Sequence, residues 1–199
     1  MQLALKDIDL KTNWIKSGKK SFLYFEKVDS TLNIALDVHH QEQSIGKIVI
    51  TDNQVSRKGT YNKSCYSEPY KDLTFSIILG SSYNFQQQLI DDTCTAIVNV
   101  LQKQKINAHH KKPNDIYVMK KKIAGILLSN VHSRKEVVYQ ALSLGININS
   151  DIDIRSFDNR AKADHTSLAK ELGREVDREK ILVKIIQSID LAIQKQVGL

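Results

Sequence analysis

The chain has 199 residues, of which 41% are hydrophobic and 26% are charged, and these proportions exclude collagen-like, coiled-coil and disordered chains. No apolar run approaches the roughly 18 residues of a membrane helix, and acids near the start interrupt the region where a signal peptide is apolar, so we expect a cytoplasmic protein with no membrane partner. The net charge of +7 favours an anionic partner, which could be nucleic acid, a phosphate compound or an acidic protein.

The first third of the chain predicts two strands and one helix. Residues 21–27 (SFLYFEK) alternate and are rich in aromatics, as a strand would be, and the N-cap types Asp, Ser and Thr then open a helix predicted over 29–39. Residues 47–51 (KIVIT) predict a second strand. The polar stretch 52–72 has no period, so we expect a long loop, and a loop of that length is usually functional or disordered.

The rest of the chain predicts a cluster of strands followed by helices. The expected elements are an apolar strand at 73–79, a helix at 84–104, strands at 115–118, 123–129 and 137–146, and helices at 166–172 and 177–197. Strands gathered in mid-chain indicate an α+β fold, in which a mixed or antiparallel sheet packs against helices on one face. No linker or repeat divides the sequence, so we expect residues 1–199 to form a single domain.

The cysteines and paired histidines form no metal or disulfide pattern. Cys65 and Cys94 belong to no CxxC pair, and we expect both to be free thiols. The pairs at 39–40 and 109–110 lack the further Cys or His residues of a metal site, so they predict polar surface.

The segment around Pro113 carries most of the chemical information. Pro113 fixes the backbone ahead of Asn114 and Asp115, and two predicted strands then meet at lysines 120–122. This order would aim an amide, a carboxylate and an ammonium group into one cleft. Gly125 has no side chain, so a ligand could lie against the backbone there.

Four motifs in register give the chain a family resemblance. PNDIYV followed by KKIAGIL, together with VDST at 28–31, the loop at 54–73 and LGININ at 144–149, resembles the catalytic domain of biotin protein ligases, in the biotin and lipoate ligase family. SEPYKDLTFSIIL and HTSL agree in order and spacing, so that the resemblance covers about residues 22–172. It implies the class II synthetase-like fold of those domains.

The resemblance implies a two-step ligase reaction. Biotin is first activated by ATP to biotinyl-5'-AMP, and the biotinyl group then passes to a lysine of a biotin carboxyl carrier domain. Such a site needs cations for the gathering negative charge, Mg²⁺ on the triphosphate and a cover that excludes water. No dedicated metal ligands are expected, apart from a contact of Asp115 with the Mg²⁺ that accompanies ATP. Family members often form homodimers through a sheet edge, and a homodimer is left open here.

The catalytic roles implied by the resemblance fall on charged residues. Lys122 opens the KIAGI segment, where the family lysine bridges the carboxylate and the α-phosphate; the alternative is a solvated lysine turn. Asn114 and Asp115 match the residues that act on the nucleotide and on the incoming lysine, although they could merely form a turn. Lys58 keeps the charge of a family arginine and is implied in catalysis and ATP binding.

The biotin-binding roles fall on small and polar residues. Ser30 and Thr31 match hydroxyls that hold the ureido oxygen, although a simple N-cap explains them equally well, and Gln54 matches a glutamine beside the ureido ring. Ser143 stands where the family commonly has another glycine. The remaining positions implied by the resemblance are Gly125, Ile126 and Gly145 for biotin and Asn147 for the nucleotide.

The long loop departs from the family pattern. The family writes a glycine-rich lid that ends in tryptophan, whereas residues 57–65 read RKGTYNKSC. Arg57 and Asn62 replace glycines, Cys65 replaces the tryptophan, and Lys58 lacks the bidentate fork of arginine. We therefore expect this chain to hold the adenylate less tightly.

Other functions remain to be weighed against the biotin ligase. About twenty residues precede the first strand and few follow the last helix, so neither an N-terminal helix-turn-helix nor a C-terminal β-barrel is expected, nor DNA repression. A lipoate or octanoate ligase shares the scaffold, and the altered lid is compatible with a binding protein that has no turnover. A nucleic-acid binder would use the basic stretch 103–112, which lacks interleaved aromatics for base stacking.

Overall fold

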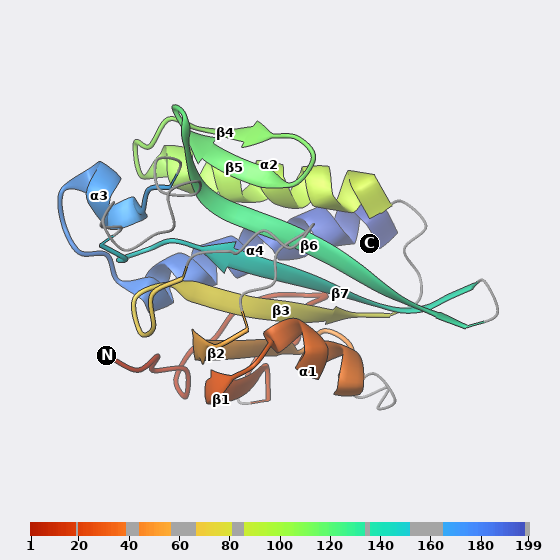
Figure 1. Ribbon diagram of the computed structural model, residues 1–199. Helices are drawn as coiled ribbons and strands as arrows, with labels where there is room; N and C mark the ends of the chain where they lie inside the picture. Colours follow the sequence, from red (N-terminus) through yellow and green to blue (C-terminus); the bar gives the residue numbers. More distant parts are fainter. Residues whose placement is uncertain are drawn as a thin grey trace.

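Seven strands form one mixed sheet in the order β1-β2-β3-β7-β6-β5-β4 (Figure 1). The computed structural model describes residues 1–18, 20–38, 44–56, 67–80, 86–133, 136–151 and 165–197. The strands are β1 (Phe22–Val28), β2 (Ile48–Gln54), β3 (Leu73–Leu79), β4 (Ala108–Lys111), β5 (Asp115–Val118), β6 (Lys121–Ser133) and β7 (Glu136–Ile146). β1 and β2 run parallel and the other neighbours run antiparallel, so the predicted mixed α+β sheet is confirmed.

Helices lie on both faces of the sheet. They are α1 (Thr31–Asp37), α2 (Gln86–Lys103), α3 (Leu168–Leu172) and α4 (Arg178–Val197). α2 and α4 pack on each other behind the sheet and share the main core with it (Figure 1). α1 lies on the opposite face, where Ala35 packs with Val49, Ile78 and Ala141. The expectation of a sheet covered on one face was therefore wrong, because the short apolar side of α1 covers part of the other. None of the helices in the described part of the chain combines the length and the apolar character needed to cross a membrane.

The alternation of β3 explains how the two faces differ. Leu73, Phe75 and Ile77 are fully buried against α2 and α4, and Thr74 and Ser76 point to the other face, since successive side chains of a strand alternate. The register pairs Thr74 and Ser76 with small residues of β7, so a polar strip of the sheet continues beyond the area under α1. This strip is the part of the fold that positions the candidate site.

Most predicted elements lie within a few residues of the observed ones, and three differ. β4 was missed because its sequence, AHHK, carries almost no apolar signal. β6 is longer than the predicted 123–129, and β2 extends to Gln54, three residues into the predicted loop, because Val28 of β1 pairs with it. The central part of that loop, residues 57–66, lies outside the described residues.

The structure describes one of the two cysteines and one of the two histidine pairs. Cys94 is a free, buried thiol of α2, and burial raises its pKa to about 12. Cys65 and the histidines at 39–40 lie outside the described residues. His109 is exposed on β4.

Candidate active site

A β-bulge in β6 sets the direction of Lys122. The pairing of β5 with β6 slips by one residue after Ile116, which leaves Ile123 as an extra residue in β6. In an unbroken strand, side chains three positions apart would point to opposite faces. The bulge instead brings Lys122 to the face of Gly125, where the lysine side chain lies directly over the glycine.

Lys122 and Asp115 form an ion pair over Gly125. The Lys122 Nζ lies 2.6 Å from the Asp115 Oδ1, and the two side chains keep 21% and 28% of their surface exposed. A Cβ on Gly125 would stand 3.0 Å from that Nζ and 3.3 Å from that Oδ1. The missing side chain of Gly125 therefore makes room for the ion pair itself.

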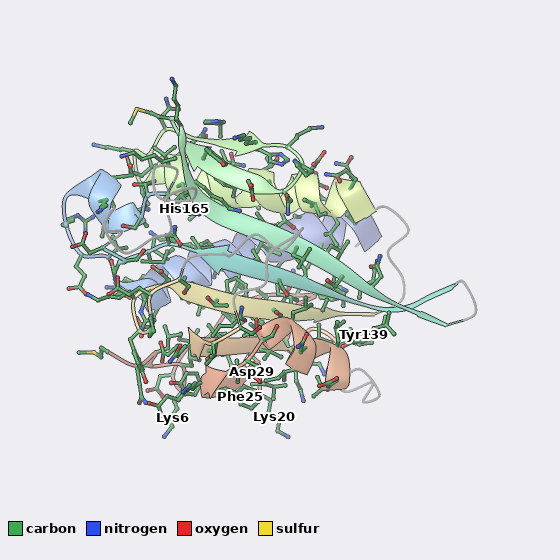
Figure 2. All side chains as sticks on the ribbon, in the orientation of Figure 1. Lys6, Lys20, Phe25, Asp29, Tyr139 and His165 are labelled. Carbon is green, nitrogen blue, oxygen red and sulfur yellow. The ribbon has the colours of Figure 1, made fainter. Side chains whose placement is uncertain are left out.

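A pocket opens beside this ion pair. Its free space is about 240 Å³, part of which is open solvent. Its lining comes from β6, β7 and the segment after β7, namely Lys122, Ile123, Ala124, Gly125, Gly145, Asn147 and His165 (Figure 2, where His165 is labelled). Among the described residues, a Cβ on Gly145 would meet nothing within 4 Å, so they leave the backbone of β7 open to a ligand at this point.

Asn147 joins two segments that line the pocket through hydrogen bonds. Its side-chain Nδ2 donates to the carbonyl of Thr166 at 3.0 Å, and its backbone N–H donates to Ile123 at 2.9 Å. The Thr166 N–H in turn donates to the carbonyl of Lys122 at 2.9 Å. Asn147 is thus 4% exposed and holds the segment at 165–168 against the bulge.

Asn114 and Ile126 support the site from β5 and β6. The Asn114 Nδ2 donates to the Ile126 carbonyl at 2.6 Å, and the Ile126 N–H donates back to the Asn114 carbonyl at 2.9 Å. The side chain of Ile126 is 1% exposed in the main core. The structure therefore does not bring the Ile126 side chain to the pocket, although Asn114 remains next to Asp115.

A second group of predicted residues meets at the start of α1. Ser30 is the N-cap, and its hydroxyl accepts a hydrogen bond from the N–H of Asn33. The N–H and the hydroxyl of Thr31 both donate to the Gln54 Oε1, at 2.9 and 3.2 Å. Ser30 thus acts as a cap, while Thr31 and Gln54, 23 positions apart, form one polar cluster.

Two serines carry this cluster across the sheet. The Ser76 hydroxyl donates to the Thr31 Oγ1 at 2.9 Å, and the Ser76 and Ser143 hydroxyl oxygens lie 2.6 Å apart. The result is a hydrogen-bonded polar chain, Gln54–Thr31–Ser76–Ser143, over β2, β3 and β7. Sequence reasoning missed Ser76; the signal was a lone hydroxyl within the apolar run FSIIL.

Asp72 is a further buried polar residue that sequence reasoning missed. Its carboxylate accepts backbone N–H bonds from Glu68, Ile148 and Ser150, at 2.8, 2.8 and 3.2 Å. It is 3% exposed, and burial raises its pKa to about 6. Asp72 therefore fixes the turn that directly follows Asn147.

The predicted lid and the predicted metal contact are described by the structure only in part. Lys58 and the other lid residues at 57–65 lie outside the described residues. No group of three or more His, Cys, Asp or Glu side chains suited to a metal occurs within the described ranges. Of the predicted residues, Lys122, Gly125, Gly145 and Asn147 line one pocket, and Asp115 joins them through its ion pair with Lys122.

The chain is similar to known ligases over most of its length. It is 27% identical over 177 residues to the bifunctional ligase/repressor BirA of Bacillus spizizenii, and the match covers 87% of this chain and 53% of BirA. The BirA of Bacillus subtilis matches to the same extent. The chain thus spans about half the length of these curated relatives.

Solved structures share its fold. The biotin protein ligase from Aquifex aeolicus in complex with biotin and ATP superposes with a TM-score of 0.74 at 25% identity, covering 88% of this chain and 71% of that one. The Leishmania major biotin protein ligase in complex with biotin gives a TM-score of 0.64 at 17% identity, covering 89% and 80%. These likenesses confirm the predicted class II synthetase-like fold of a biotin protein ligase catalytic domain.

A family model matches more than half of the chain. The model described as the biotin/lipoate A/B protein ligase family matches residues 24–149, which run from within β1 to just past the end of β7 and include every predicted site residue. The predicted resemblance is confirmed, and the chain belongs to the biotin/lipoate A/B protein ligase family.

Proposed function

We propose that residues 1–199 form the catalytic domain of a biotin protein ligase, which activates biotin with ATP and transfers it to a lysine of a biotin carboxyl carrier domain. The observation that carries this proposal is the ion pair of Lys122 and Asp115 beside an open pocket. Family membership supports acyl ligation, and the similar structure from Aquifex aeolicus supports biotin and ATP as the substrates.

In the first step Lys122 brings two anions together. A carboxylate oxygen of biotin attacks the α-phosphorus of ATP, the bond from that phosphorus to the bridging oxygen breaks, and pyrophosphate leaves. The ammonium of Lys122 stabilises the negative charge on the carboxylate and the phosphate. To reach them it leaves Asp115, at small cost because both side chains are partly exposed.

In the second step Asp115 becomes available as a base. The acceptor lysine attacks the carbonyl carbon of the mixed anhydride, an amide forms, and AMP leaves. The attacking nitrogen must lose a proton, and a carboxylate within hydrogen-bond reach can accept it. When Lys122 moves from Asp115 to the phosphate, it stabilises the anions of the first step and frees Asp115 to act as the base of the second.

Mg²⁺ fits this site as a companion of the nucleotide. Magnesium ions are usually held by one or two carboxylates together with phosphate oxygens, and there they neutralise phosphate charge. Asp115, the partly exposed carboxylate paired with Lys122, would hold the ion. Asn114, the neighbouring residue, would support the same edge of the nucleotide.

The polar chain favours biotin over an alkyl acid. Gln54 and Ser143, the two ends of this polar chain, are partly exposed and offer an amide and a hydroxyl to which a ureido ring can hydrogen-bond, whereas the carbon atoms of an octanoyl chain cannot. Thr31 and Ser76 are buried between them and hold both ends in place. Gly145 leaves the backbone open between this polar chain and Lys122. We therefore propose that biotin lies along β7 with its carboxylate toward Lys122.

The first test measures adenylate formation. Biotin-dependent exchange of pyrophosphate into ATP should fall by about 10²–10³-fold in Lys122→Ala, because one preorganised charge is lost from the transition state. Lys184→Ala, which removes an exposed lysine of α4, is the matched control and should leave exchange unchanged. Unchanged exchange in a folded Lys122→Ala protein would remove Lys122 from the mechanism.

The second test separates the alternative functions. Incubation with ATP, Mg²⁺ and a carboxyl carrier domain should label the carrier when biotin is supplied, and not when lipoate or octanoate replaces it. Labelling by lipoate or octanoate would instead identify an alkyl-acid ligase. Biotin binding without exchange or labelling would identify a binding protein.

A further inference from the structure

The charge of the chain is concentrated in one segment. Residues 103–122 contain seven lysines and one aspartate, a net charge of +6 in a chain whose total is +7. The other 179 residues are therefore nearly neutral. The segment forms the end of α2, the strands β4 and β5, and the start of β6.

The exposed lysines of this segment lie at one edge of the sheet, from the end of α2 through β4 to the turn before Lys122. We call them the basic edge; its members are Lys103, Lys105, Lys111, Lys112, Lys120 and Lys121, all exposed. β4 is the last strand of the sheet, and β1 and α1 lie at the opposite edge (Figure 1). Lys121 directly precedes Lys122, so the basic edge runs up to the candidate active site.

We propose that the basic edge is the docking surface for an acidic protein domain, the carrier that presents the acceptor lysine. This inference rests on the proposed function, in which a second protein must approach Lys122 and Asp115. Clustered charge beside a site steers an oppositely charged partner and accelerates encounter without requiring tight binding. Fast encounter with weak binding suits a substrate protein that must leave after each transfer.

The side chains of the basic edge favour an acidic protein over a nucleic acid. The segment contains no arginine, the residue whose planar fork matches phosphate. Its one tyrosine, Tyr117, has the Lys111 Nζ 4.1 Å above its ring centroid, so that face is covered against base stacking. Lysines act instead as hydrated point charges opposite carboxylates.

Protection of an exposed strand edge does not account for the whole pattern. Lysines on edge strands do prevent edge-to-edge pairing, and Lys111 of β4 serves that purpose. Lys103 lies on α2, however, and Lys120 lies in the turn between β5 and β6, so neither guards the edge. The lysine cluster therefore extends beyond the edge strand, onto the end of α2 and into the turn that precedes Lys122.

The test reverses charge on two matched surfaces. One variant carries Lys111→Glu, Lys120→Glu and Lys121→Glu. The control carries Lys6→Glu, Lys20→Glu and Lys184→Glu, which are exposed and lie outside the segment 103–122 (Figure 2 labels Lys6 and Lys20). Both change the net charge equally, and glutamate preserves edge protection. Anisotropy of a labelled, unbiotinylated acidic carboxyl carrier domain measures docking even in the absence of turnover.

The proposal makes separate predictions for docking and for chemistry. In low salt, carrier affinity and the kcat/KM for transfer should fall about 10- to 100-fold in the first variant and remain within about twofold in the control. The salt dependence of wild-type docking should be lost with the same three lysines. Unchanged carrier affinity in the first variant would overturn the docking surface, whereas absent pyrophosphate exchange in the wild type would overturn the proposed function alone. A short RNA duplex that binds the wild type through these lysines, with carrier binding unaffected, would also overturn it.

Discussion

Two ion pairs show how this fold separates structure from chemistry. The Arg178–Asp52 pair, 2.8 Å long, is almost completely buried, with side chains 6% and 0% exposed. The Lys122–Asp115 pair, 2.6 Å long, keeps more than a fifth of each side chain exposed beside the pocket. Both are short, so distance alone does not distinguish their roles.

Further hydrogen bonds hold both partners of the buried ion pair in place. The second carboxylate oxygen of Asp52 accepts bonds from the Leu3 N–H at 3.0 Å and the Tyr24 hydroxyl at 2.8 Å. Arg178 also donates to the backbone carbonyls of Asp72 and Met1. These bonds join the chain start, β1, β2, the residue before β3 and α4. Lys122 and Asp115 lie instead over a glycine, where a ligand can replace either partner.

The largest expected effect comes from breaking the buried pair. Asp52→Ala leaves the Arg178 charge buried without its partner and should lower the free energy of unfolding by about 3–5 kcal/mol. Asp115→Ala removes a partly exposed partner and should cost less than about 1 kcal/mol. Urea denaturation of both variants measures the contrast. Equal losses would show that the two pairs play the same structural role.

Asp72 extends the comparison to a buried carboxylate bonded by N–H groups. Its pKa is about 6 in the folded protein, above the ordinary value of 3.8, because burial disfavours the charged form. Between these values the folded chain binds a proton that the unfolded chain does not. The contribution of Asp72 to the free energy of unfolding should therefore rise as pH falls from 7 to 4, by about 3 kcal/mol.

The measurement is the difference in unfolding free energy between the wild type and Asp72→Asn across that pH range. Asp190→Asn is the matched control, since Asp190 is equally buried and accepts N–H bonds from Asn13, Trp14 and Ile15. The wild type should gain stability relative to Asp72→Asn on acidification. A constant or opposite difference would contradict the raised pKa.

The sequence predicted which charged residues meet better than it predicted the contacts that support them. Asn114, Asp115 and Lys122 are close in sequence and stand in a motif, so their meeting follows from two paired strands. The Ile123 bulge could not be predicted, because an extra residue in a strand leaves no periodic signal when both neighbours are apolar.

Polar contacts between residues far apart in the chain could not be predicted from the sequence either. Asp52 and Arg178 are separated by 126 positions, and neither position alone indicates a buried partner. β4 was not predicted, because strand prediction depends on apolar alternation. Its pairing with β5 depends instead on backbone hydrogen bonds and a polar surface. Helix α1 was predicted, but its position on the second face depends on small residues such as Ala35 and Ala141 that meet only in the folded sheet.

The smallest expected effect tests the two glycines of the pocket against each other. In Gly125→Ala the new Cβ would lie 3.0 Å from the Lys122 Nζ, so the ammonium must shift from its place over the strand. Stability should change by less than about 1 kcal/mol, because the pair is partly exposed, while kcat for adenylate formation falls about tenfold through misplacement of Lys122.

Gly145→Ala distinguishes ligand approach from lysine placement. Its Cβ would meet no atom of the described part of the chain within 4 Å, so Lys122 and Asp115 keep their positions. If biotin lies along β7, the added methyl occupies ligand space and should raise the KM for biotin with kcat nearly unchanged. Steady-state pyrophosphate exchange at varied biotin measures both constants. The same kcat and KM changes in both variants would mean that the two glycines do not divide the site as the geometry indicates, because only one of them lies beneath the lysine.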